Sequence, residues 1–211
     1  MNDTSAINAS IDAALKEKAE ALLTKAGLTP SQAIETLYQQ IVLQQKFPLP
    51  QAHKQNTTLQ HFKPELIVYD FDGVMTDNLA WVNEQGIESV AVNRSDGLGI
   101  NILRANGFRQ MILSTEANIV VTTRAKKLNL PVIQNCSNKH QALSDFCQKE
   151  QIDLTKVVYV GNDVNDLAAM KSVGYSICPA DAHPEILTIA DFVTCSKGGK
   201  GVIRELSDLL G

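Results

Sequence analysis

Two kinds of segment, with different patterns of apolar and polar residues, follow each other along residues 65–211. Short apolar runs are followed by longer segments whose apolar residues recur every three or four positions, and Gly, Asn, Asp or Pro separate them. This pattern is typical of strands joined by crossover helices, so it predicts an α/β fold built on a doubly wound parallel sheet. The predicted strands are 66–70, 111–114, 132–134, 157–161, 175–178 and 192–194, and the predicted helices are 97–106, 118–128, 139–149, 166–172 and 201–210.

A short interruption follows the first of these strands. Residues 81–90 read as two short strands around a turn at 83–86, which predicts a β-hairpin. Only about forty residues separate Asp72 from Ser114. That length leaves room for a hairpin flap over the sheet, and not for a separate cap domain.

The N-terminal part has a different pattern. Residues 5–11 alternate, with Ile7, Ala9 and Ile11 on one face, which predicts a short strand. Two helices are expected after it, the first between Asp12 and Gly27 and the second from Pro30 onward. So small a unit buries too little apolar surface alone, so we expect it to dimerise. The predicted domains are 1–50 and 65–211, joined by a polar linker at 51–64.

Composition narrows the class of protein. The chain has 211 residues, of which 44% are hydrophobic, and its net charge of −4 gives no general attraction to nucleic acid. No apolar run approaches the roughly 18 residues of a membrane-spanning helix, and the N-terminus lacks the pattern of a secretion signal. The four cysteines form no Cys-x-x-Cys pair. We therefore expect a cytoplasmic protein with reduced thiols and no membrane partner.

Candidate chemistry lies directly after the first predicted strand. Asp70 and Asp72 stand one residue apart and Gly73 follows them. In open α/β sheets ligands bind at the carboxyl ends of strands. Two carboxylates there suit a hard divalent cation or an attack of one carboxylate on phosphorus. Asp and Gly are also common in solvated turns, so this segment alone leaves both interpretations open.

Several segments together resemble one known group of enzymes. Residues 70–77 (Asp-Phe-Asp-Gly-Val-Met-Thr-Asp) resemble the first motif of the haloacid dehalogenase superfamily of phosphatases. The resemblance is to the branch of 3-deoxy-D-manno-octulosonate 8-phosphate phosphatases and the phosphatase-like domains of sialic acid synthetases. Six later segments continue it in the same order, at 95–100, 112–115, 137–139, 161–166, 180–184 and 198–201.

The resemblance implies a role for each matching residue. Asp70 would be the nucleophile that forms an aspartyl-phosphate, and Asp72 the general acid–base. Ser114 and Lys139 would bind and neutralise the phosphoryl group, and Asp166 would support Lys139. Mg²⁺ would be held by Asp70, Asp72, Asn162 and Asp163, and substrate contacts are expected from Gly73, Asp77 and Thr115. The glycine-rich segment 198–201 is either an anion cradle near a helix start, with Lys200 as a substrate contact, or a flexible turn. The substrate would be a small sugar-acid phosphate or a related phosphomonoester, and the enzyme a homotetramer.

Two positions depart from the pattern of that family. Asn162 stands where the family usually has an aspartate on the metal, so the site loses one negative charge and some Mg²⁺ affinity. Glu116 stands where the sugar-acid phosphatases tend to have arginine, which removes a contact for an anion. The serine, threonine and glutamate at 114–116 are closer to the sialic-acid-associated members.

The N-terminal part carries a second resemblance. Residues 7–12, 15–16, 27–29 and 46–49 resemble ribbon-helix-helix antitoxins of the RelB/DinJ type, in which paired strands from two subunits enter the DNA major groove. Ala6, Asn8 and Ser10 would face the bases of a DNA operator. Residues 1–50 hold four basic and five acidic side chains, which opposes tight DNA binding.

Two hypotheses follow from different classes of protein. The first is an active phosphatase with a ribbon-helix-helix module. The second is an antitoxin or transcriptional regulator, with a toxin protein as partner and a degenerate phosphatase-like domain that serves oligomerisation or sensing. The neighbouring genes would discriminate between them.

Overall fold

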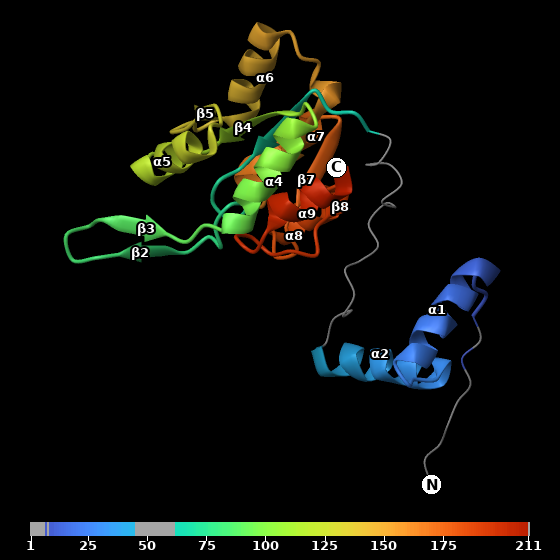
Figure 1. The fold of residues 1–211 in the computed structure, drawn as a ribbon. Helices are drawn as coiled ribbons and strands as arrows, with labels where there is room; N and C mark the ends of the chain where they lie inside the picture. The colour runs from blue at the N-terminus through green and yellow to red at the C-terminus, as the bar shows by residue number, and fades with distance from the viewer. Residues whose placement is uncertain (1–6, 8, 45–61, 211) are drawn as a thin grey trace. The chain divides into compact units, whose positions relative to one another are not determined.

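The structure, a computed structural model, describes residues 7, 9–44 and 62–210 (Figure 1). Internal contacts divide the chain into two compact units, Met1–Gln51 and Ala52–Gly211. Most of the predicted linker, 51–64, lies outside the described residues. Among the helices in the described ranges, none is long and apolar enough to cross a lipid bilayer.

The larger unit is built on a six-stranded parallel sheet with the strand order β5-β4-β1-β6-β7-β8. Its strands are β1 (Leu66–Tyr69), β4 (Arg109–Leu113), β5 (Val132–Ile133), β6 (Val157–Val160), β7 (Tyr175–Cys178) and β8 (Phe192–Val193). The chain leaves β1 toward β4 on one side and returns to β6 on the other, so β1 lies at the point where the strand order reverses. The predicted α/β fold with a doubly wound parallel sheet is confirmed.

Helices cover both faces of the sheet (Figure 1). Successive strand residues point to opposite faces, so Ile67 packs with α4 (Arg94–Ala105), α5 (Ile119–Leu128) and α9 (Val202–Leu210). Leu66 packs with α6 (Lys139–Glu150), α7 (Leu167–Ser172) and α8 (Pro184–Ile189) on the other face. All four residues of β1 and of β6 are buried, as expected for central strands of a parallel sheet.

The motif at 95–100 proves to be structural. Asp96 Oδ1 accepts hydrogen bonds from the main-chain N–H groups of Ile203 (3.0 Å) and Arg204 (3.1 Å), and so caps the start of α9 from α4. A Cβ atom on Gly99 would lie 2.8 Å from the main-chain oxygen of Ile203. Glycine is therefore required here because the two helices pack at closer range than a side chain allows.

The predicted hairpin is present as β2 (Ala80–Val82) and β3 (Glu88–Val90), paired antiparallel. Gly86, with φ of 76°, donates its main-chain N–H to the Asn83 oxygen at 2.9 Å and closes the turn. The hairpin extends away from the sheet (Figure 1). Its single tryptophan, Trp81, is exposed.

The smaller unit contains two helices, α1 (Ala13–Lys25) and α2 (Pro30–Gln44). Asp12 caps α1 by accepting the Leu15 N–H at 2.9 Å, as its sequence position predicts. The predicted strand at 5–11 is not observed: residues 7 and 9–11 have no regular structure, and 5, 6 and 8 lie outside the described residues. A strand of this kind needs a second strand for its main-chain hydrogen bonds, and the single chain pairs none of its described residues with it.

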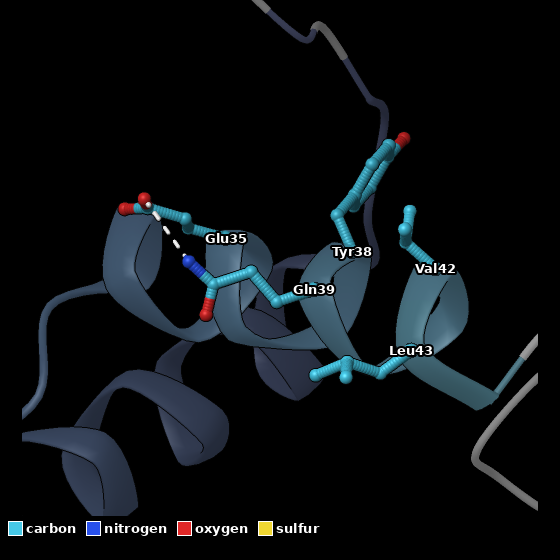
Figure 2. A pocket seen from close by; sticks show the side chains of 5 residues that line it. All are labelled: Glu35, Tyr38, Gln39, Val42 and Leu43. Carbon is cyan, nitrogen blue, oxygen red and sulfur yellow. Dashed lines mark hydrogen bonds between the residues drawn. The ribbon is translucent and has the colours of Figure 1, made fainter.

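Apolar side chains stay exposed along both of these helices. No residue of α1 is buried. Along α2 a hollow of about 400 Å³ is lined by Glu35, Tyr38, Gln39, Val42 and Leu43. Figure 2 shows Tyr38 and Val42 pointing to the same side of the helix. Among the described residues of this unit, the other large apolar side chains that are exposed are Ile7, Ile11, Leu15, Leu22, Leu28 and Ile34.

Candidate active site

The site is built on the residue that directly follows β1. Asp70 continues the sheet for one residue, because its main-chain N–H donates to the Val160 oxygen of β6 at 2.9 Å. Its side chain is buried, with 4% of the residue exposed. Asp70 Oδ1 accepts the N–H of Phe71 at 2.7 Å, so the carboxylate is held against the turn that follows the strand.

Lys139 lies between two buried carboxylates. Its Nζ is 2.7 Å from Asp70 Oδ1 and 2.7 Å from Asp166 Oδ1, and it is almost fully buried. Burial disfavours the ammonium, but the charges of Asp70 and Asp166 outweigh it and raise the pKa of Lys139. For Asp70, burial and then the charge of Asp166 raise the pKa, and Lys139 opposes both. With all three groups ionised, this buried cluster carries one unbalanced negative charge.

Asp166 has four hydrogen-bond donors. Besides Lys139, the Tyr159 hydroxyl donates to its Oδ1 at 2.8 Å, and the N–H groups of Asn162 (2.9 Å) and Asp163 (3.3 Å) donate to its Oδ2. The carboxylate therefore fixes the loop after β6 as well as the lysine. The role of Tyr159 was not identified from the sequence. The one indication was a hydroxyl-bearing residue in a strand whose other residues are aliphatic.

Asp72 is half-buried beside the same turn. Its Oδ1 accepts a hydrogen bond from the Thr76 hydroxyl at 3.2 Å. Burial raises the pKa of Asp72, the hydrogen bond from Thr76 lowers it, and the charges of Glu116 and Glu88 raise it further. Gly73 follows with φ of 78°, which turns the chain back and brings the Asp72 main-chain oxygen toward the site. A carboxyl group in this setting keeps its proton to higher pH than usual.

Asn162 faces Asp70 and Asp72 from the end of β6. One end of its amide lies 3.0 Å from Asp70 Oδ2 and 2.8 Å from the Asp72 main-chain oxygen. With the nitrogen turned to these atoms, Asn162 donates a hydrogen bond to each. A Cβ atom on Gly73 would overlap the same amide, so glycine is needed for the approach.

The same three positions fit a divalent cation when the amide oxygen faces inward. Adjacent ligands of an octahedral ion with bonds of about 2.1 Å lie about 3 Å apart, which matches the distances from Asn162. Asp163 is turned elsewhere, because its Oδ1 accepts the Val164 N–H at 2.7 Å and caps the 3₁₀ turn η2 (Val164–Asp166). In the described part of the chain no group of three His, Cys, Asp or Glu side chains is placed to hold a metal.

Ser114 lies at the carboxyl end of β4, the neighbour of β1. Its main-chain N–H donates to the Ile133 oxygen at 2.9 Å, which keeps it in line with the sheet edge where Asp70 lies. Its hydroxyl accepts the N–H of Glu116 at 3.1 Å and has its own hydrogen to donate. Thr115 is exposed beside it, with its Oγ1 3.5 Å from Asn165 Nδ2.

Lys200 contacts the loop after β1, with its Nζ 3.3 Å from Asp77 Oδ2. In the glycine-rich segment 198–201, two of the N–H groups that an anion cradle would need are already used. Gly198 N–H donates to Asp181 Oδ1 (2.9 Å), and Gly199 N–H donates to the Val74 oxygen (3.0 Å). This segment braces the loop after β1 instead.

Two residues near the site, Asn118 and Glu88, were not identified from the sequence. Asn118 Nδ2 donates to Glu88 Oε2 at 3.0 Å, which joins β3 of the hairpin to the start of α5. These residues lie outside the motifs and meet only in the folded chain. Of the predicted DNA-reading residues, Ser10 is exposed, and Ala6 and Asn8 lie outside the described residues.

Comparison with known proteins identifies the family. The family model for haloacid dehalogenase-like hydrolases matches residues 100–206. The chain belongs to this family, and it is a phosphatase of the haloacid dehalogenase type. A second family model, that of the RelB antitoxins, matches residues 4–65. The prediction of the superfamily is thus confirmed.

Particular relatives narrow the class further. The chain is similar to the 3-deoxy-D-manno-octulosonate 8-phosphate phosphatase KdsC of Escherichia coli K12, with 38% identity over 146 residues, 69% of this chain and 78% of the relative. It is also similar to that phosphatase from Moraxella catarrhalis, solved with magnesium ion, phosphate ion and KDO (30% identity, TM-score 0.69, 73% and 88% covered). The cobalt-bound deoxy-D-mannose-octulosonate 8-phosphate phosphatase of Haemophilus influenzae is similar as well (28% identity, TM-score 0.67, 74% and 89% covered).

Proposed function

We propose that the larger unit is a Mg²⁺-dependent phosphomonoesterase that acts through an aspartyl-phosphate on Asp70. The observation that carries this proposal is the buried contact of Lys139 with both Asp70 and Asp166, at 2.7 Å each. A merely structural ion pair would need one carboxylate, whereas this cluster leaves a negative charge at the open end of the sheet. The phosphatase relatives and the metal ions in two of their structures support the same conclusion.

The first step transfers the phosphoryl group to the protein. The Asp70 carboxylate forms a new bond to phosphorus while the bond to the ester oxygen breaks, and that oxygen takes a proton from Asp72. The raised pKa of Asp72 means that it keeps this proton to higher pH than an ordinary aspartate does. Ser114 donates to a phosphoryl oxygen, and the Lys139 ammonium offsets negative charge on the attacking carboxylate.

The second step releases inorganic phosphate. Water attacks the phosphorus of the aspartyl-phosphate, Asp72 takes the proton of the water, and the bond to Asp70 breaks, which restores both carboxyl groups. Asp70 Oδ2, the Asp72 main-chain oxygen and the Asn162 amide oxygen would hold Mg²⁺. When bound, this ion lets an anionic carboxylate approach an anionic phosphate and stabilises the charge on the phosphoryl oxygens.

The test is phosphate release from an aryl phosphate and from a panel of sugar phosphates with Mg²⁺ present. We expect Asp70→Asn and excess EDTA each to abolish release, because the first removes the nucleophile and the second the cation. The matched control is Asp145→Asn, which neutralises an exposed aspartate on α6 and should leave the rate unchanged. An unmodified protein that hydrolyses none of the panel, or an Asp70→Asn variant with full activity, would contradict the proposal.

The substrate class that we propose is a small phosphorylated sugar or sugar acid. Glu88 on β3 of the hairpin is close enough to Asp72 to raise its pKa, and the described residues of this unit form no further domain that would cover the site. A small ester could therefore reach Asp70 from the end of the sheet. In this proposal the enzyme assembles as a homotetramer in which neighbouring subunits help to enclose each site.

A second function is proposed for the smaller unit, which would be a ribbon-helix-helix dimerisation module with affinity for a DNA operator or a toxin protein. The match of the RelB antitoxin family to residues 4–65 supports it. The exposed apolar residues of α1 and α2 support it too, because such a unit needs a second copy to bury them. The strand segment would acquire its hydrogen-bond partner in the same dimer.

A further inference from the structure

Asn162 is a buried side chain whose amide has two useful orientations. Only 8% of the residue is exposed. Asp70 Oδ2 and the Asp72 main-chain oxygen both lie within 3.0 Å of one end of the amide. Both are hydrogen-bond acceptors, so an amide oxygen placed there is favourable only with a cation between the three atoms, and an amide nitrogen placed there is favourable without one.

We infer that the Asn162 amide nitrogen and a divalent cation compete for the same two oxygens, so that Asn162 stabilises the metal-free site. This inference rests on the proposed function in placing the cation at Asp70. In the metal-free protein the nitrogen donates to Asp70 Oδ2 and to the Asp72 oxygen at 3.0 and 2.8 Å. To bind a cation, the protein first breaks these two hydrogen bonds and turns the amide over.

The usual family residue at this position could not do the same. An ionised aspartate has no hydrogen to donate, so without a cation its oxygens would face Asp70 Oδ2 and a carbonyl oxygen, and like charges at this range repel. With a cation bound, the same aspartate would add a full negative charge to the ligand set. Compared with aspartate, asparagine therefore stabilises the metal-free protein and stabilises the metal-bound protein less. Both effects weaken the affinity for the ion.

The test is the substitution Asn162→Asp, with two readouts that do not depend on activity. In EDTA we expect the variant to unfold at lower temperature than the unmodified protein, by about 2–4 °C or more. On adding Mg²⁺ alone we expect a larger rise in its unfolding temperature than in the unmodified protein. Titration calorimetry with MgCl₂ should show about 10-fold to 100-fold tighter binding by the variant.

The matched control is Asn165→Asp, which adds the same charge to the same loop at an exposed position. We expect it to leave the unfolding temperature in EDTA unchanged and Mg²⁺ affinity within about threefold, because an exposed charge is screened by salt. An Asn162→Asp variant that is as stable as the unmodified protein in EDTA, or that binds Mg²⁺ no more tightly, would overturn the inference. If the unmodified protein had no phosphatase activity, the proposed function would be contradicted, but these measurements of stability and Mg²⁺ binding would still test the inference.

Discussion

Three buried charged groups meet at the site, and two of them have the same sign. Lys139 Nζ is equally close to Asp70 and to Asp166, so one ammonium serves two carboxylates. Transfer of these groups from water costs several kcal/mol each, and the contacts offset that cost only while all partners are present. The cluster is therefore weak evidence for stability and strong evidence for a site that attracts a cation.

Removal of the Lys139 ammonium should destabilise the folded protein. Lys139→Met should lower the free energy of unfolding by about 3–5 kcal/mol, because it leaves two buried carboxylates without a counter-charge. Urea unfolding measures this change. Adding Asp166→Asn to the same variant should recover part of the loss.

Lys156→Met is the matched control, because Lys156 forms a solvent-exposed ion pair with Glu65. Its loss should leave the unfolding midpoint nearly unchanged. If Lys139→Met is as stable as Lys156→Met, the three groups are not all ionised in the folded protein, and the charge argument for the site fails.

The hairpin and the loop before α5 each contribute one acidic side chain near Asp72 (Glu88 and Glu116), and we call this pair the acidic rim. Asn118 caps α5 through its Oδ1 and donates from its Nδ2 to Glu88 on β3. Glu116 Oε1 accepts the N–H groups of Ala117 (2.7 Å) and Asn118 (2.8 Å), which fixes its carboxylate in the same loop. Burial is the largest cause of the raised pKa of Asp72. The charges of Glu116 and Glu88 raise it as well, against the Thr76 hydrogen bond and the charge of Lys139. Within the proposed substrate class, negative charge here should favour uncharged sugar phosphates over sugar-acid phosphates.

The acidic rim predicts the order in which the enzyme prefers phosphate esters of similar size and different charge. Glucosamine 6-phosphate, glucose 6-phosphate and 6-phosphogluconate carry the same phosphate ester and differ in a positive, absent or negative charge. We expect kcat/KM to fall in that order, by about fivefold at each step. Glu116→Gln should narrow the differences, and Glu84→Gln, at the exposed hairpin turn, should not. A preference for the carboxylate in the unmodified protein would show that the acids face away from the substrate.

The sequence predicted those elements whose signals are local. The strand at 66–70 and the helix at 139–149 were found because each carries its own apolar pattern, and both agree with the structure to within one residue. The helix expected at 97 begins earlier, at Arg94, because Asn93 caps it by accepting the Ser95 N–H. The strand at 5–11 was not observed, since its stability depends on another strand.

Contacts between distant residues account for what the sequence did not show. Asp96 caps a helix that begins about one hundred residues later, whereas the sequence showed only that its motif resembles a segment of the family. The residue types at Asp70, Lys139 and Asn162 were identified from the resemblance, but the two amide orientations of Asn162 follow only from its distances to Asp70 and Asp72. Local pattern and motif order therefore indicate which residues matter, and the geometry indicates how they act.

For the whole molecule, the two units differ in how much they bury. The larger unit contains an apolar core on both faces of its sheet, whereas α1 of the smaller unit has no buried residue. A domain with its own core should fold without the other unit, and a unit without one should depend on association. Removal of the smaller unit should therefore affect assembly and DNA binding without affecting chemistry.

Comparison of the full chain with a chain that begins at residue 52 separates the roles of the two units. Both should release phosphate at the same rate per active site, because Asp70, Lys139 and Asp166 belong to the larger unit. Only the full chain should retard its own promoter DNA in a gel, and only at low salt, since four basic and five acidic residues in 1–50 give few phosphate contacts. Sedimentation equilibrium should give a larger assembly for the full chain. No retardation together with a larger assembly would leave dimerisation as the role of the smaller unit, and equal assembly sizes would exclude that role as well.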